Sequence, residues 1–219
     1  MKRSATRISA ILFFLLMTVS IGEPVYAYLL QGPHVLDLMI AKLGKARGVW
    51  VSQTLEIYRS GAQQPPVELD ETLRYGFPEM FRSDIETEST QRIHVLSMGD
   101  VLTIVDGKVE SETETRFDLY KDILLFRARP LLIERLSHFG VDTAISSLGR
   151  YQGKIAWVVG AYYPDESVPQ VWIDKDSFLP FRWIVTRTVG GNRKDALEVR
   201  YLQWRKVQDT FYPMRIEFH

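Results

Sequence analysis

The sequence predicts an α+β protein in which an antiparallel β-sheet of about ten strands is combined with three helices. Three observations lead to this fold class. Apolar and polar residues alternate along many short segments, as they do on strands with one buried face. Turn residues separate these segments closely, which favours antiparallel pairing of consecutive strands. Two other stretches repeat apolar residues every three or four positions, which is the period of a helix.

The first helix is expected to begin at Gly32-Pro33. Proline is favoured in the first turn of a helix, and glycine is favoured just beyond its last residue. Gly44 and Gly48 therefore mark the end. Apolar residues recur at helical spacing between these limits, at Val35, Leu38, Met39 and Leu43. This helix should present one apolar face.

The strands are expected in two groups, residues 49–115 and residues 143–218, which we interpret as parts of one sheet. Asp106-Gly107 predicts a type I′ turn between two strands of the first group. In the second group, Trp157, Trp183 and Val199 each alternate with residues of the opposite face. One face of the sheet is therefore apolar and aromatic, and it needs a cover.

The stretch between the two groups, Phe117–Phe139, is predicted to be helical and unusually apolar. From Leu119 to Phe139, 12 of 21 residues are apolar or aromatic. Pro130 should divide the stretch into two short helices, and Gly140 should end the second. The apolar residues cover more than one helical face, which is more than a simple cover of a sheet needs.

Two interpretations of this pattern stay open. The helices pack tightly on the sheet and close an ordinary core, or they lid an apolar cavity under a curved sheet. Burying an acyl chain of about 15 carbons is worth roughly 12 kcal/mol, which only a deep, dry chamber provides.

The first 27 residues are predicted to be a secretory signal peptide. Lys2, Arg3 and Arg7 precede the apolar run Ile8–Gly22, and Val25-Tyr26-Ala27 fits cleavage after Ala27. The apolar run of 15 residues is short for a membrane span, which needs about 20. Cleavage would leave 24 basic and 26 acidic residues in an exported domain, residues 28–219.

Composition excludes several classes of function. The full sequence has 27 basic and 27 acidic residues, so a dedicated nucleic-acid binder is not expected. It has no cysteine, which excludes disulfides, thiolate metal sites and a lipid-anchor cysteine.

No catalytic or metal-binding arrangement is evident, so we expect no enzyme activity, no cofactor and no metal. No two histidines have zinc-ligand spacing, and Ser146-Ser147 lacks the frame of a nucleophile elbow. Asp174-Lys175-Asp176 is interpreted as a turn. The remaining polar candidates are expected to be ordinary surface or partly exposed residues: His94, His138, Glu110, Glu112, Glu114, Arg182, Arg187, Arg193 and Lys194.

Four short motifs occur in a fixed order along the chain: Gly76-Phe77-Pro78-Glu79-Met80-Phe81-Arg82, Val105-Asp106-Gly107-Lys108, Val171-Trp172-Ile173-Asp174 with Leu179-Pro180, and Tyr212-Pro213. With the order helix, strands, two-helix insertion, strands, they resemble the periplasmic lipoprotein carriers of the LolA/LolB superfamily. The resemblance extends from about Val35 to Phe218. It implies a single curved antiparallel sheet, an incomplete barrel, with three helices lidding an apolar cavity that holds acyl chains.

The resemblance also implies site residues and partners. The expected lipid-binding cavity residues are Leu55, Trp157, Phe181, Trp183 and Val199; the expected lid residues are Leu124, Leu125, Leu132 and Leu136. Phe77 and Pro78 form the expected latch region, where Phe77 replaces the arginine that latches the lid in the carriers.

The expected function is a periplasmic carrier that binds acyl chains of lipids or lipoproteins and shuttles them toward the outer membrane. Its partners would be an inner-membrane export complex and an outer-membrane acceptor. The alternative is a periplasmic sensor or protein-interaction domain of the same fold without a transport role.

Overall fold

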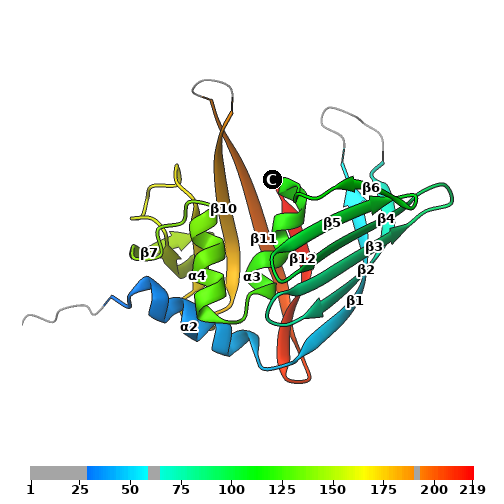
Figure 1. The fold of residues 1–219 in the computed structure, drawn as a ribbon. Helices are drawn as coiled ribbons and strands as arrows, with labels where there is room; N and C mark the ends of the chain where they lie inside the picture. The colour runs from blue at the N-terminus through cyan, green and yellow to red at the C-terminus, as the bar shows by residue number, and fades with distance from the viewer. Residues whose placement is uncertain (1–28, 59–64, 190–192) are drawn as a thin grey trace, which may run out of the picture.

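Two six-stranded antiparallel sheets form the framework of the protein (Figure 1). The computed structural model describes residues 29–58, 65–189 and 193–219, so the predicted signal peptide lies outside the described residues. The N-terminal sheet contains β1 (Gly48–Ile57), β2 (Val67–Gly76), β3 (Met80–Glu86), β4 (Gln91–Ser97), β5 (Asp100–Val105) and β6 (Lys108–Ser111). The C-terminal sheet contains β7 (Ser146–Tyr151), β8 (Lys154–Val159), β9 (Gln170–Asp174), β10 (Pro180–Val189), β11 (Arg193–Val207) and β12 (Thr210–Phe218).

Each strand pairs with its neighbour in sequence, so both sheets are simple meanders. The turns explain why. Asp106 and Gly107 have φ angles of 49° and 77°, the left-handed conformation at both positions that a type I′ turn requires. Gln152 and Gly153 repeat this geometry with 49° and 83°. The α+β class and the antiparallel hairpins predicted from the sequence are confirmed.

The expectation of one continuous sheet of about ten strands was wrong. β1 and β12 belong to different sheets, and an isolated bridge between Gly44 and Thr210 joins the sheets at one end. From there β1 and β12 diverge, and the two sheets open away from each other (Figure 1). Hairpin signals report only pairing between consecutive strands, and β1 and β12 lie at opposite ends of the strand order.

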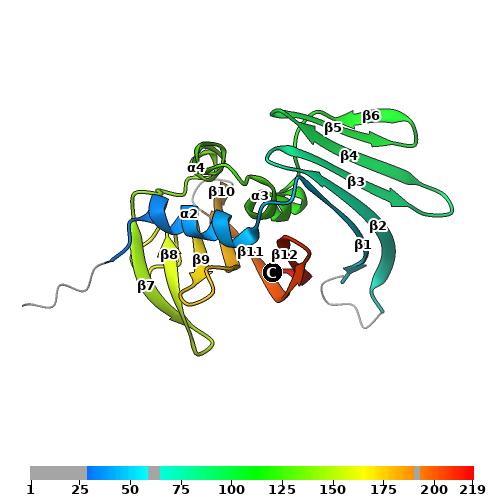
Figure 2. The same ribbon diagram turned by 90° about the horizontal axis from the view of Figure 1, so that it is seen from below.

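The helices lie between and below the two sheets (Figures 1 and 2). α2 (Gly32–Leu43) begins with Pro33 in its first turn and ends before Gly44, whose φ is 104°. The chain between the sheets forms a 3₁₀ helix, η1 (Arg116–Lys121), followed by α3 (Asp122–Leu125) and α4 (Arg129–His138).

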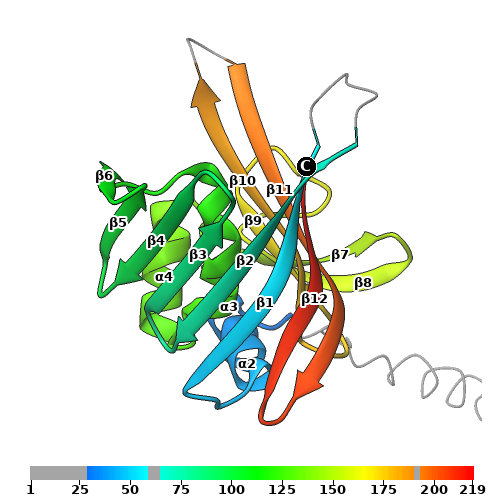
Figure 3. The same ribbon diagram turned by 90° about the vertical axis from the view of Figure 1, so that its right-hand side faces the viewer.

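Residues 116–138 together form the helical segment. As predicted, Pro130 stands in the first turn of α4, and Gly140 follows its end with a φ of 79°. The segment lies between the two sheets, with the inner faces of both toward it (Figures 2 and 3).

One apolar cluster, the central cluster, contains side chains from both sheets and from the helices. Leu36 and Met39 of α2, Leu73 of β2, Leu125 of α3 and Trp183 of β10 all belong to it and have no exposed surface. Burial of a side chain of this size contributes about 1.5–3 kcal/mol. The two sheets therefore share one core, and the helical segment fills its centre.

Gly44 provides a test of the junction between the two sheets. A Cβ at Gly44 would lie 2.0 Å from the Asp209 carbonyl oxygen, whereas a Cβ at Gly153 would meet nothing within 4 Å. Both glycines have positive φ, so alanine costs about 1 kcal/mol of backbone strain at either position. We expect Gly44→Ala to lower the free energy of unfolding by at least about 2 kcal/mol more than Gly153→Ala in urea denaturation. Equal losses would show that the junction is not tightly packed.

Candidate functional site

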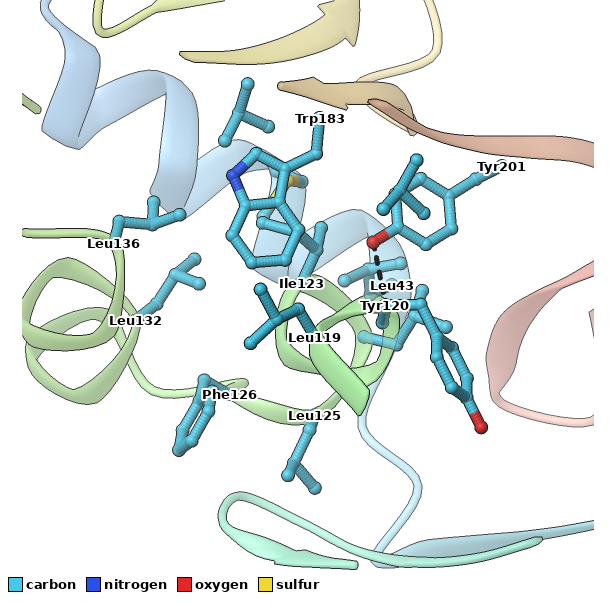
Figure 4. Close-up of a cluster of buried hydrophobic side chains, with 14 of the residues drawn as sticks. Leu43, Leu119, Tyr120, Ile123, Leu125, Phe126, Leu132, Leu136, Trp183 and Tyr201 are labelled. Atoms are coloured by element: carbon cyan, nitrogen blue, oxygen red, sulfur yellow. Dashed lines mark hydrogen bonds between the residues drawn. The ribbon is translucent and has the colours of Figure 1, made fainter. Parts of the chain in front are cut away.

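Most of the predicted cavity and lid residues meet in the central cluster. Trp157, Trp183 and Val199 lie on the inner face of the C-terminal sheet and are at most 6% exposed. The four predicted lid leucines pack in the same cluster and are at most 1% exposed: Leu124, Leu125, Leu132 and Leu136. Figure 4 shows Leu132 and Leu136 of α4 beside Trp183. The helical segment therefore packs directly on the sheet face that was predicted to need a cover.

Two indole N–H groups in this cluster have no hydrogen-bond acceptor within the part of the chain that the structure describes. They are Trp157 Nε1 and Trp183 Nε1. Trp183 contacts the ring of Phe139 edge-on, with the ring centroids 5.7 Å apart. A buried donor without a partner costs about 1–3 kcal/mol. The packed arrangement of helical segment on sheet thus carries an energetic cost at its centre.

Two of the predicted cavity residues lie elsewhere. Phe181 belongs to a second, smaller cluster with Trp172, on the opposite face of the C-terminal sheet from Trp183. A register shift between Pro180 and Arg182 accounts for this, because it breaks the alternation that would place Phe181 beside Trp183. Leu55 lies on β1 and is half-buried.

The predicted latch region contacts an arginine that the sequence analysis did not single out. Pro78 is exposed, and Phe77 is half-buried beneath the guanidinium of Arg127, whose central carbon lies 3.6 Å from the ring centroid. Arg127 donates to Thr210 Oγ1 (2.6 Å) and to the carbonyl of Leu43 (3.3 Å). The helical segment is thus fastened to the N-terminal sheet, to α2 and to β12 through one side chain.

The charge of Arg127 has no carboxylate partner among the described residues. Burial lowers its pKa to about 10, so the side chain is still charged at neutral pH. The aromatic face of Phe77 stabilises this cation. The arginine at this contact therefore comes from the helical segment, and the aromatic ring comes from the turn before β3, where the resemblance implied an arginine.

Four buried charged side chains, three in the helical segment and Glu114 just before it, hold this part of the chain together. Arg135 Nε of α4 donates to Asp122 Oδ2 of α3 at 2.7 Å, and both Arg135 and Lys121 bind Glu114. Burial raises the pKa of Glu114, but the charges and hydrogen bonds of Lys121 and Arg135 together lower this pKa below its ordinary value. The segment is therefore built as one unit. Glu114 was expected on a solvated strand face, which was wrong because β6 ends at Ser111.

Two further contacts join this unit to the sheets. Arg92 Nη2 of β4 donates to Asp118 Oδ1 at 2.9 Å, and Thr115 donates to the same carboxylate. On the other side, the Tyr201 hydroxyl of β11 donates to the backbone carbonyl of Tyr120 at 2.8 Å (Figure 4).

The inner face of the N-terminal sheet is more polar than expected. Glu71 accepts hydrogen bonds from Gln53 and Ser83 of the neighbouring strands. His94 was expected to be partly exposed; it is fully buried, and its Nδ1 lies 2.9 Å from Thr103 Oγ1. Alternation along a strand does not show which face of the sheet is covered. A polar residue on the covered face, such as His94, is therefore easily predicted to be exposed to solvent.

Arg182 was also expected to be at least partly exposed, which was wrong. It is 4% exposed and pairs with Glu166 and Glu198. The side chains of Arg187, Arg193 and Lys194 lie outside the described residues. Asp174 does form a turn, because its Oδ1 accepts from Ser177 N at 2.8 Å.

Within the described part of the chain, no group of three histidine, aspartate or glutamate residues is arranged to hold a metal ion. Over the same ranges, no helix has the length and apolar character that crossing a membrane requires.

The architecture is similar to two solved structures. A LolA superfamily protein from Nitrosomonas europaea matches with a TM-score of 0.52 over 87% of this chain and 86% of its own, at 13% identity. An outer membrane lipoprotein-sorting protein domain from Vibrio parahaemolyticus matches with a TM-score of 0.54 over 85% of this chain and 84% of its own, at 8% identity. No protein-family model and no curated protein matches the sequence. The chain has a LolA/LolB-like fold, as its motifs and element order predicted.

Arg127 is predicted to limit opening of the helical segment. Arg127→Met removes its hydrogen bonds and its contact with Phe77, and amide hydrogens of the segment should exchange about tenfold faster. Arg129→Met is the matched control, because Arg129 forms an exposed ion pair with Asp37 and no other ion pair with the described residues. Hydrogen exchange with mass spectrometry measures both. The same exchange rate in both variants would contradict this role.

Asp118 is predicted to link stability to pH. Burial raises its pKa, but His94, Thr115 and Arg92 together lower it below its ordinary value. A lowered pKa contributes stability above the unfolded value of about 3.9, and this stability is lost as the pH falls further. The free energy of unfolding of the wild type should exceed that of Asp118→Asn by about 1–3 kcal/mol at pH 7, and this difference should shrink as the pH falls below the unfolded pKa of about 3.9. The exposed Asp100→Asn serves as the control. A difference independent of pH would contradict the linkage.

Proposed function

We propose that this protein is a periplasmic carrier that binds the acyl chains of lipids or lipoproteins and moves them toward the outer membrane. In this proposal residues 1–27 are a cleaved signal peptide, and the exported domain binds rather than catalyses. The acyl chain lies between the helical segment and the inner face of the C-terminal sheet. An inner-membrane export complex and an outer-membrane acceptor would be its partners.

The observation that carries the proposal is the packing of the helical segment. Its four leucines belong to the same buried apolar cluster as Trp157, Trp183 and Val199, so the segment and the sheet both offer the apolar contacts that an acyl chain needs. Each methylene buried there contributes about 0.8 kcal/mol. The fold shared with a LolA superfamily protein and with a lipoprotein-sorting domain supports the same function.

Entry of a chain requires the helical segment to move, because its leucines are fully buried as the structure stands. Three features make movement of the whole segment feasible. Its internal ion pairs keep it in one piece, a small number of polar contacts fasten it to the sheets, and the two unpartnered indole N–H groups raise the energy of the packed state. An acyl chain would take over the apolar contacts that the leucines release.

The alternative, a sensor or protein-interaction domain of the same fold, was motivated by Phe77 in place of an arginine. Arg127 supplies a guanidinium at the same point of the structure, stacked on Phe77. The replacement therefore does not by itself favour the alternative over a carrier.

A brominated acyl chain tests the proposed position, because bromine quenches indole fluorescence only at short range. Binding should reduce the tryptophan emission of the wild-type protein, and Trp183→Phe should remove part of that reduction. Trp172→Phe is the control, since Trp172 lies in the second cluster on the other face of the sheet. Native mass spectrometry measures the bound chain independently. A protein that binds no acyl ligand in either assay would contradict the carrier function.

A further inference from the structure

Three tyrosines of different elements come together between the two sheets. Tyr75 of β2 and Tyr212 of β12 lie with their ring centroids 5.8 Å apart, and Tyr75 is 5.0 Å from Phe81 of β3. Tyr120 of η1 contacts Phe81 at 6.4 Å and Phe218 of β12 at 5.6 Å. Tyr120 therefore contacts side chains of both sheets, while its ring points away from the leucines of the helical segment (Figure 4).

The hydroxyl groups of these tyrosines are incompletely satisfied. Tyr120 is only 8% exposed, and its buried hydroxyl has no hydrogen-bond partner among the described residues. The hydroxyls of Tyr75 and Tyr212 are 3.4 Å apart, longer than an ordinary hydroxyl–hydroxyl bond. Only one of that pair can donate to the other. At least two O–H donors of the cluster therefore lack an acceptor: the Tyr120 hydroxyl and the hydroxyl that accepts within the Tyr75–Tyr212 pair. Buried polar groups normally have hydrogen-bond partners.

These phenols are donors at neutral pH. Burial, and next the negative charge of Glu71, raise the pKa of Tyr120 well above its ordinary value. Burial likewise raises the pKa of Tyr75 and of Tyr212. A nearby carboxylate disfavours a second negative charge. The cluster is therefore suited to an uncharged group that accepts hydrogen bonds.

The inner side of β1, next to the cluster, is only partly covered. Val49 and Val51 share a face with Tyr75 and Leu73, because each valine is directly opposite one of them in the β1–β2 pairing. Tyr75 and Leu73 are buried, whereas both valines are half-exposed. The inner side of β1 is thus less covered than that of β2, at the edge where β1 and β12 separate (Figure 1).

We infer that the Tyr75, Tyr120 and Tyr212 hydroxyls form a binding site for the ester or amide carbonyl oxygen that joins an acyl chain to its head group. The inference rests on the proposed function, because the site serves the polar end of the same ligand. The acyl chain extends from this carbonyl into the central cluster, and the head group leaves along β1. A carbonyl oxygen has two lone pairs, so it accepts from two phenols at once.

The test compares two uncharged probes of equal chain length, methyl palmitate with an ester carbonyl and hexadecyl methyl ether without one. Displacement of a fluorescent fatty-acyl probe gives their affinities. Tyr120→Phe should weaken methyl palmitate binding about fivefold, because one neutral hydrogen bond is lost, and should weaken binding of the ether clearly less, because an ether oxygen is the poorer acceptor. The variant should fold normally, since it loses a buried hydroxyl that has no partner.

Tyr201→Phe is the matched control, because the Tyr201 hydroxyl is already bonded to the Tyr120 carbonyl. It should change the affinity of both probes equally. If Tyr120→Phe weakens neither probe or both alike, the carbonyl site is overturned while the carrier function stands. If the wild-type protein binds neither probe, the carrier function fails and the inference fails with it.

Discussion

The helical segment is the common cover of two sheets, and the rest of the structure depends on that arrangement. Each sheet is a meander whose inner face is apolar or partly apolar, and the sheets are joined directly at one end by the bridge between Gly44 and Thr210. The space between them is filled by Ile123, Leu125 and their neighbours. Without the segment, both inner faces would meet water and the shared core would be lost.

The helical segment contacts the C-terminal sheet through apolar side chains, whereas ion pairs join its own helices to one another. Buried ion pairs are costly to form, since desolvation offsets much of their attraction. Their effect here is to fix the shape of the segment: Arg135 joins α4 to Asp122 of α3, and Lys121 and Glu114 complete the group. Attachment to the sheets uses a different set of contacts, led by Arg127 and the Arg92–Asp118 pair. A segment that is rigid internally and fastened at a few points is suited to move as a whole.

Local features were predictable from the sequence, and contacts between distant strands were not. The bounds of α2, the break at Pro130 and the turn at Asp106-Gly107 follow from the conformational limits of proline and glycine, so they were predicted correctly. The split into two sheets depends on how the first and last strands meet, which no local pattern encodes. Phe181 was misplaced because a register shift reversed its direction. Arg127 and the tyrosine cluster were missed because their partners come from α2, β2 and β12 and become neighbours only in the folded chain.

The central claim is that the helical segment moves away from the C-terminal sheet to admit an acyl chain. The chain has no cysteine, so spin labels on introduced cysteines at exposed Ser137 of α4 and exposed Arg150 of β7 would report one defined distance. Labels at Arg150 and the exposed Arg205, both within the C-terminal sheet, give the reference distance. Pulsed electron paramagnetic resonance should show the first distance lengthening when an acylated ligand binds, with the reference unchanged. A bound ligand with no change in the first distance would contradict the account.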